Sequence, residues 1–128
     1  ECFKHLDVKP NYVPEITGLW AMVNCPGSRN NVHTHPYNYL SGVYYLKVPK
    51  KSGNLVFLEP KPQAEVLSPP KKENSSVYTA HSVSWEPKEN SLIFFPSWLQ
   101  HEVLTNNSND DRVILSFNIN WRKEDANN

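Results

Sequence analysis

Short apolar runs separated by turn residues dominate this chain, and they restrict the folds that it can adopt. Seven segments are rich in β-branched and aromatic residues, which is typical of strands. They cover residues 18–25, 39–48, 54–59, 77–85, 91–95, 99–105 and 112–121. No sustained helical period of apolar residues is present, and eleven prolines disfavour long helices. The sequence therefore predicts an all-β protein with few or no helices.

Residues with turn chemistry separate the predicted strands. Pro26-Gly27-Ser28 and Lys51-Ser52-Gly53 both interrupt extended structure, and Asn90 stands where a left-handed residue is often needed before the next strand. Residues 60–76 carry four prolines and are predicted to form a surface loop. We expect residues 1–128 to form one domain, cut from a slightly longer parent chain because the sequence begins at Glu1 rather than at Met.

Charge and cysteine content argue against several classes of protein. Lys and Arg balance Asp and Glu at 13 each, and a neutral chain without a basic run gives no indication of nucleic-acid binding. No apolar segment has the length of a membrane span, and nothing in the sequence indicates an oligomeric state. Cys2 and Cys25 are too few for a secreted disulfide framework. We therefore expect free thiols and a cytoplasmic, intracellular protein.

Three histidines form the most informative candidate site. Within a strand, the side chains of His33 and His35 would point to the same face, and His101 is distant in the sequence, so only the fold can bring it to them. Neutral imidazole is a common ligand for iron, zinc, copper and nickel, and three protein ligands leave coordination positions open. The set predicts a metal site. The alternative is two surface histidines beside a Pro36 turn, with His101 unrelated.

The last predicted strand alternates between two kinds of face. One face holds Arg112, Ile114, Ser116 and Asn118, and the other holds Val113, Leu115, Phe117 and Ile119. We expect the second face to pack against a core and the first to line a ligand site. A sheltered guanidinium binds a carboxylate bidentately, so Arg112 is predicted to hold an anion beside the metal. The alternative is an ordinary arginine on a solvent-facing strand.

Tyr45 is a further candidate for binding the anion. It shares a strand face with Ser41 and Val43, and its hydroxyl could donate to a carboxylate held by Arg112. The alternative is an aromatic ring that fills the core. Among sandwiches and barrels, the double-stranded β-helix, a cupin-like jelly roll, best fits a His-x-His pair near one strand and a distant histidine on a later strand.

The order of these motifs resembles the Fe(II)/2-oxoglutarate-dependent dioxygenases, in particular the prolyl-hydroxylase-like branch with its phage and bacterial relatives. The resemblance covers residues 18–121 and rests on His33-Thr-His35, LSGVYYL, Gly53-Asn-Leu-Val-Phe, SLIFFPSWLQHEV and Arg112-Val-Ile-Leu-Ser. It implies an enzyme that uses Fe(II) and the cosubstrate 2-oxoglutarate to hydroxylate a small molecule or peptide.

The resemblance also implies roles for individual residues. His33 and His101 would bind iron, and Arg112 would hold the distal carboxylate of 2-oxoglutarate with help from Tyr45 and Ser116. No catalytic residue beyond the metal ligands is implied.

His35 departs from the family pattern, which has Asp or Glu at this position. A third neutral imidazole leaves the metal more positive than a carboxylate would. Two other interpretations therefore stay open: a cupin-type enzyme with three histidines that does not use 2-oxoglutarate, and a non-catalytic metal- or ligand-binding module of the same fold. Residues that select the substrate are expected in the loops 26–32 and 60–76. Trp20, Trp98 and Trp121 are expected in the core, with the pocket wall as the alternative.

Overall fold

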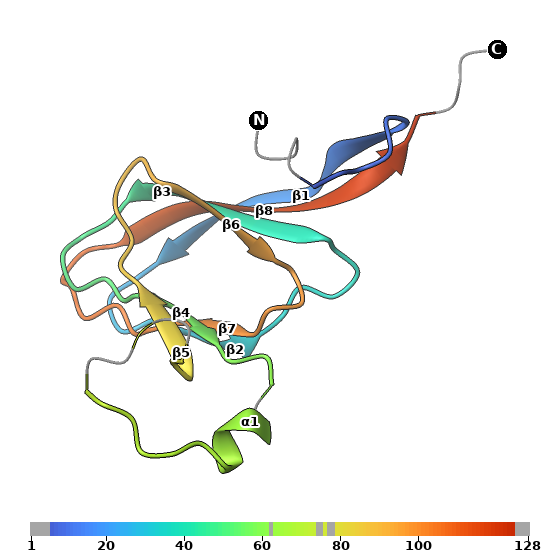
Figure 1. The fold of residues 1–128 in the computed structure, drawn as a ribbon. Coiled ribbons are helices and arrows are strands. Elements are labelled where there is room, and N and C mark those ends of the chain that lie inside the picture. Colours follow the sequence, from blue (N-terminus) through green and yellow to red (C-terminus); the bar gives the residue numbers. More distant parts are fainter. Residues whose placement is uncertain (1–5, 62, 74–75, 77–78, 125–128) are drawn as a thin grey trace.

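Two antiparallel sheets of four strands face each other in the computed structural model, which describes residues 6–61, 63–73, 76 and 79–124 (Figure 1). In sheet A the strands lie in the order β1-β8-β3-β6, and in sheet B in the order β2-β7-β4-β5. Sheet A consists of β1 (Tyr12–Asn24), β8 (Arg112–Lys123), β3 (Leu40–Lys47) and β6 (Leu92–Pro96). Sheet B consists of β2 (Asn30–His33), β7 (His101–Val103), β4 (Leu55–Leu58) and β5 (Ser82–Trp85).

The chain crosses repeatedly from one sheet to the other, which is the topology of a double-stranded β-helix. The predicted fold class is therefore confirmed. A single helical turn, α1 (Gln63–Val66), lies within the segment predicted to be a surface loop. In the part of the chain that the structure describes, no helix is long and apolar enough to cross a membrane.

The predicted strands are present, with different boundaries. The strand predicted over 77–85 is β5, which begins only at Ser82, and residues 77 and 78 lie outside the described part. β1 begins at Tyr12, before the predicted start at residue 18, and contains Pro14. Proline is tolerated there because β1 is an edge strand, where an N–H is not needed on the open side. Asn90 has a φ of 61°, as predicted for a left-handed position.

The core lies between the sheets, on the side of β8 that carries Arg112. Its buried centre contains Val43, Tyr45, Leu55, Phe95 and Ile114. The prediction that the opposite face of β8 packs against a core is wrong for Val113, Leu115 and Phe117, which are only half-buried on the outer side of sheet A, whereas Ile119 is buried at 4% exposure. On that side Gly42 lies opposite Phe117 in the strand register. A Cβ atom at Gly42 would lie 2.3 Å from Phe117 Cζ, so only glycine leaves room for the ring.

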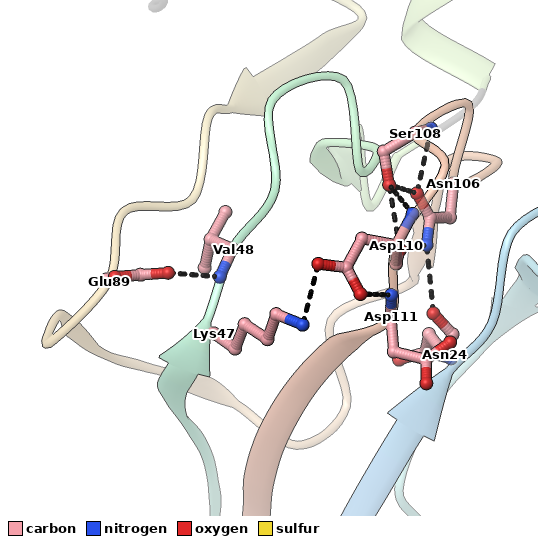
Figure 2. Close-up of polar contacts among 8 residues, drawn as sticks. All are labelled: Asn24, Lys47, Val48, Glu89, Asn106, Ser108, Asp110 and Asp111. Carbon is pink, nitrogen blue, oxygen red and sulfur yellow. Dashed lines mark hydrogen bonds and ion pairs between the residues drawn. The ribbon is translucent and has the colours of Figure 1, made fainter.

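Side chains around the loop between β7 and β8 hold the start of β8 in place (Figure 2). Asn106 is 1% exposed, and its Nδ2 donates to the carbonyl oxygen of Asn24 at the end of β1 and to that of Asp110. Lys47, at the end of β3, forms an ion pair of 2.7 Å with Asp110. β1 and β3, the two neighbours of β8, are both bonded to this loop. These contacts fix the position of Arg112, the first residue of β8.

Candidate functional site

The three histidines meet between the two sheets. His33, the last residue of β2, lies opposite His101, the first residue of β7. One potential ligand atom from each of His33, His35 and His101 lies within 4.8 Å of the other two. Their ring centroids are 4.3 Å apart for His33 and His101, 5.0 Å for His35 and His101, and 5.1 Å for His33 and His35. The fold therefore brings the sequence-distant histidine to the other two.

His35 lies in this cluster, but not because it shares a strand with His33, as was predicted. β2 ends at His33, so His35 is not on the same strand and the same-face argument does not apply to it. Its backbone N–H donates instead to the carbonyl oxygen of Ser97, just after β6, at 2.8 Å. The backbone of His35 is thus hydrogen-bonded to the segment that follows β6 of sheet A.

Two of the histidines have a defined tautomer. Nδ1 of His33 donates to the carbonyl oxygen of Asn31 at 2.7 Å, and Nδ1 of His101 donates to that of Leu99 at 2.8 Å. Because a carbonyl oxygen can only accept, Nδ1 carries a hydrogen in each ring. In the neutral form of each ring, Nε2 is therefore the nitrogen available to a metal.

Burial favours the neutral form of two of the imidazoles. It lowers the pKa of His101 to about 4, against the opposing effect of the hydrogen bond to Leu99, and the charges of His33 and His35 lower it further. Burial also lowers the pKa of His35, followed by the effect of His33. Neutral rings need not lose a proton before they bind a cation.

A cavity of about 230 Å³ opens beside the histidines. Its wall consists of Trp20, Met22, Asn30, His33, His35, Val43, Tyr45, Leu55, Phe95, His101, Val103, Arg112, Ile114 and Ser116. None of these residues is acidic. Glu102, which follows His101, is not among them and lies 4.0 Å from the Arg29 guanidinium. Within the described residues the cavity therefore offers a cation three imidazoles and no carboxylate.

Arg112 supplies the positive charge of this cavity and is 1% exposed. Its Nη1 donates to the carbonyl oxygens of Ser52 at 2.7 Å and Gly53 at 3.0 Å. Gly53 has a φ of 92°, and a Cβ there would lie 2.0 Å from the Leu104 carbonyl oxygen, so glycine is required. Nε and Nη2 of Arg112 are buried without a hydrogen-bond acceptor among the residues described. A buried guanidinium edge without acceptors is costly unless a ligand provides them.

Tyr45 and Ser116 lie in the same cavity wall as Arg112. Tyr45 is 3% exposed, and its ring is 5.3 Å from that of Trp85. Burial raises the pKa of Tyr45 to about 12, while the charge of Arg112 opposes the rise, so the phenol stays protonated and can donate. The Ser116 hydroxyl is in weak contact with Met22 Sδ at 3.9 Å. Both predicted side chains thus line the space that Arg112 faces.

Trp20 takes the alternative that the sequence left open, a place in the cavity wall. Trp20 was expected in the core but lines the cavity at 38% exposure, and Trp98 is not in the core either, at 63% exposure. Trp20 lies opposite Ser116 in the register of β1 and β8, on the same face as Met22. The period-two pattern of β1, matched to that of β8, is the signal that identifies it.

A family model described as "Putative 2OG-Fe(II) oxygenase" matches residues 18–118. The chain belongs to this 2-oxoglutarate–Fe(II) oxygenase family. This confirms the resemblance found in the sequence. None of the curated proteins matches the chain in sequence.

Several solved structures share the fold of this chain. An oxidoreductase of the family from Burkholderia pseudomallei has a TM-score of 0.62 at 15% identity, over 84% of this chain and 45% of that one. A Pseudomonas putida prolyl-4-hydroxylase has a TM-score of 0.55 at 19% identity, over 84% and 52%. HygX from Streptomyces hygroscopicus, solved with iron bound, has a TM-score of 0.58 at 12% identity, over 83% and 57%. The chain therefore spans about half the length of these proteins.

The residues of the cavity fit the groups that the oxygenase family implies. The Nε2 lone pairs of His33 and His101, together with the His35 ring, are nitrogen donors of the type that Fe(II) accepts. The free Nε and Nη2 of Arg112 match the two oxygens of a carboxylate. The imidazole nitrogens that would bind a metal and the Arg112 N–H groups that would bind a carboxylate line the same cavity.

Proposed function

We propose that this chain, acting as one domain, is an Fe(II)- and 2-oxoglutarate-dependent oxygenase that hydroxylates a small molecule or a peptide. One observation carries the proposal: the unpaired guanidinium edge of Arg112 and the three histidines line the same cavity. His33, His35 and His101 would hold the metal. When bound, Fe(II) and 2-oxoglutarate supply the dioxygen chemistry, in which the cosubstrate is oxidised to succinate and carbon dioxide.

The residues of the chain bind and orient the cosubstrate. Nε and Nη2 of Arg112 would donate to the distal carboxylate of 2-oxoglutarate, and the Tyr45 hydroxyl would donate to the same group. The buried apolar residues of the same cavity wall, which include Leu55 and Ile114, would limit access of water and strengthen these charge-assisted hydrogen bonds. We also propose an intracellular location, because a reducing compartment keeps the exposed Cys25 a thiol and iron in the ferrous state.

A second function is favoured by the lack of acidic residues in the cavity wall. A three-histidine enzyme of the cupin type would not use 2-oxoglutarate, and Arg112 would then bind a carboxylate of the substrate itself. A binding module without catalysis would retain the cavity and lack turnover.

Anaerobic titration with Fe(II), with and without 2-oxoglutarate, separates these functions. The oxygenase proposal predicts a visible charge-transfer band only when both are present, and succinate formation after air is admitted. Tight Fe(II) binding without any spectral change on addition of 2-oxoglutarate would favour the cupin-type enzyme. If no divalent metal ion binds at all, only the non-catalytic binding module remains as an explanation.

A further inference from the structure

His35 is held by sheet A although it follows a strand of sheet B. Its Nδ1 lies 2.6 Å from Ser41 Oγ and 3.1 Å from Asn118 Oδ1. Ser41 is on β3 and lies opposite Asn118 on β8 in the strand register. Ser97, whose carbonyl oxygen accepts from the His35 N–H, follows β6, the other neighbour of β3. Three adjacent strands of sheet A thus contribute to the environment of one imidazole.

With Oδ1 of Asn118 facing Ser41 and His35, one arrangement of protons satisfies every hydrogen bond in this cluster. Ser41 and Ser97 are both fully buried, and their hydroxyl oxygens are 2.8 Å apart. The Ser41 hydroxyl donates its single hydrogen to Asn118 Oδ1 at 2.8 Å, because an amide oxygen can only accept. Ser41 Oγ then accepts from the Ser97 hydroxyl and from the Nδ1–H of His35. Asn118 Oδ1 also faces Nδ1, which further disfavours a lone pair there.

We propose that Ser41, Ser97 and Asn118 are positioning residues that hold His35 in its Nδ1–H tautomer, with Nε2 as the third metal donor. This inference rests on the proposed function, because it assigns His35 to the metal site of that function. A carboxylate ligand presents equivalent oxygens, whereas an imidazole binds a metal only through the nitrogen that lacks a hydrogen. Backbone carbonyls select that nitrogen in His33 and His101, and the side-chain cluster does so in His35.

Nitrogen-15 NMR of the wild-type, metal-free protein at neutral pH tests the tautomer directly. We expect a pyrrole-type resonance for His35 Nδ1 and a pyridine-type resonance for Nε2. The reverse assignment, with the hydrogen on Nε2, overturns the proposal. This measurement needs neither a variant nor turnover.

Zn(II) affinity, measured by competition with a chelator, tests the positioning role. Asn118→Leu removes the acceptor at similar volume and should weaken Zn(II) binding by about 10- to 100-fold, whereas Asn118→Asp keeps an acceptor and should restore it. Asn120→Leu is the matched control, since Asn120 is on the same strand and bonds only the backbone of Tyr37 and Tyr39 among the contacts described. If Asn118→Leu does not fold, Ser41→Ala provides the same test.

The outcomes distinguish this inference from the proposed function. If His35→Ala weakens Zn(II) binding and neither Asn118→Leu nor Ser41→Ala does, the positioning role is wrong and the three-histidine site stands. If the wild-type protein binds no Zn(II), the metal site of the proposed function is wrong. If the NMR and Zn(II) results agree with the inference and no succinate forms, the oxygenase activity alone is wrong.

Discussion

Replacing Arg112 by methionine should abolish tight binding of 2-oxoglutarate and leave the metal site intact. Nη1 of Arg112 is already bonded to the carbonyl oxygens of Ser52 and Gly53, so Nε and Nη2 remain for the ligand. Loss of one partner from a desolvated charge pair costs about 2–5 kcal/mol. At about 1.4 kcal/mol for each factor of ten, the dissociation constant should rise by roughly 30- to 4,000-fold.

Calorimetric titration of 2-oxoglutarate into Zn(II)-loaded protein measures this change without turnover. Arg112→Lys keeps the charge but not the forked donor geometry, and should fall between wild type and Arg112→Met. Arg122→Met is the control, because Arg122 is an exposed arginine of the same strand and lies 3.7 Å from Glu15. Equal losses of Zn(II) and 2-oxoglutarate affinity in Arg112→Met, or an unchanged affinity for 2-oxoglutarate, would refute the reasoning.

Three further changes test other parts of the structure. His35→Asp, which introduces the ligand of the family pattern, should keep or raise Fe(II) affinity in an anaerobic titration; a variant that cannot fold would identify His35 as a packing residue. Gly42→Ala should destabilise the protein by about 1–3 kcal/mol in urea unfolding, because its Cβ would meet Phe117 at 2.3 Å, whereas a Cβ at Gly18 has its nearest neighbour at 3.4 Å. Equal effects of Gly42→Ala and Gly18→Ala would contradict this explanation. The metal-free protein should lose stability as the pH falls from 6.5 to 4, because the unfolded chain protonates His101 and the folded chain, where its pKa is about 4, does not. His101 should account for about 3 kcal/mol of this loss, so the loss should be smaller in His101→Phe, where His35 still contributes, and identical pH profiles for the two proteins would exclude this cause.

Local alternation was enough to predict which side chains share a strand face. Arg112, Ser116 and Tyr45 all lie on inner faces, as the pattern of two residues per repeat indicates. The same pattern does not say which face of a strand points inward. Val113, Leu115 and Phe117 of the apolar face of β8 lie outside because the inner face borders a ligand cavity, where polar groups are needed.

The sequence pattern could not predict contacts between segments that are distant in the chain. The position of His35 was predicted from strand geometry, and it depends instead on Ser97, which follows β6 of the other sheet. Asn118 was predicted to be on the inner face, but its bond with His35 depends on how β3 and β8 pair. Strand register is a property of the whole fold, so no local pattern contains it.

The three imidazoles belong to both halves of the sandwich. His33 and His101 extend from sheet B, and His35 is hydrogen-bonded to sheet A through Ser41. An ion bound by all three would be a cross-link between the layers, so its binding energy would add to the cohesion of the folded chain. Iron starvation would then reduce the lifetime of this protein as well as its turnover.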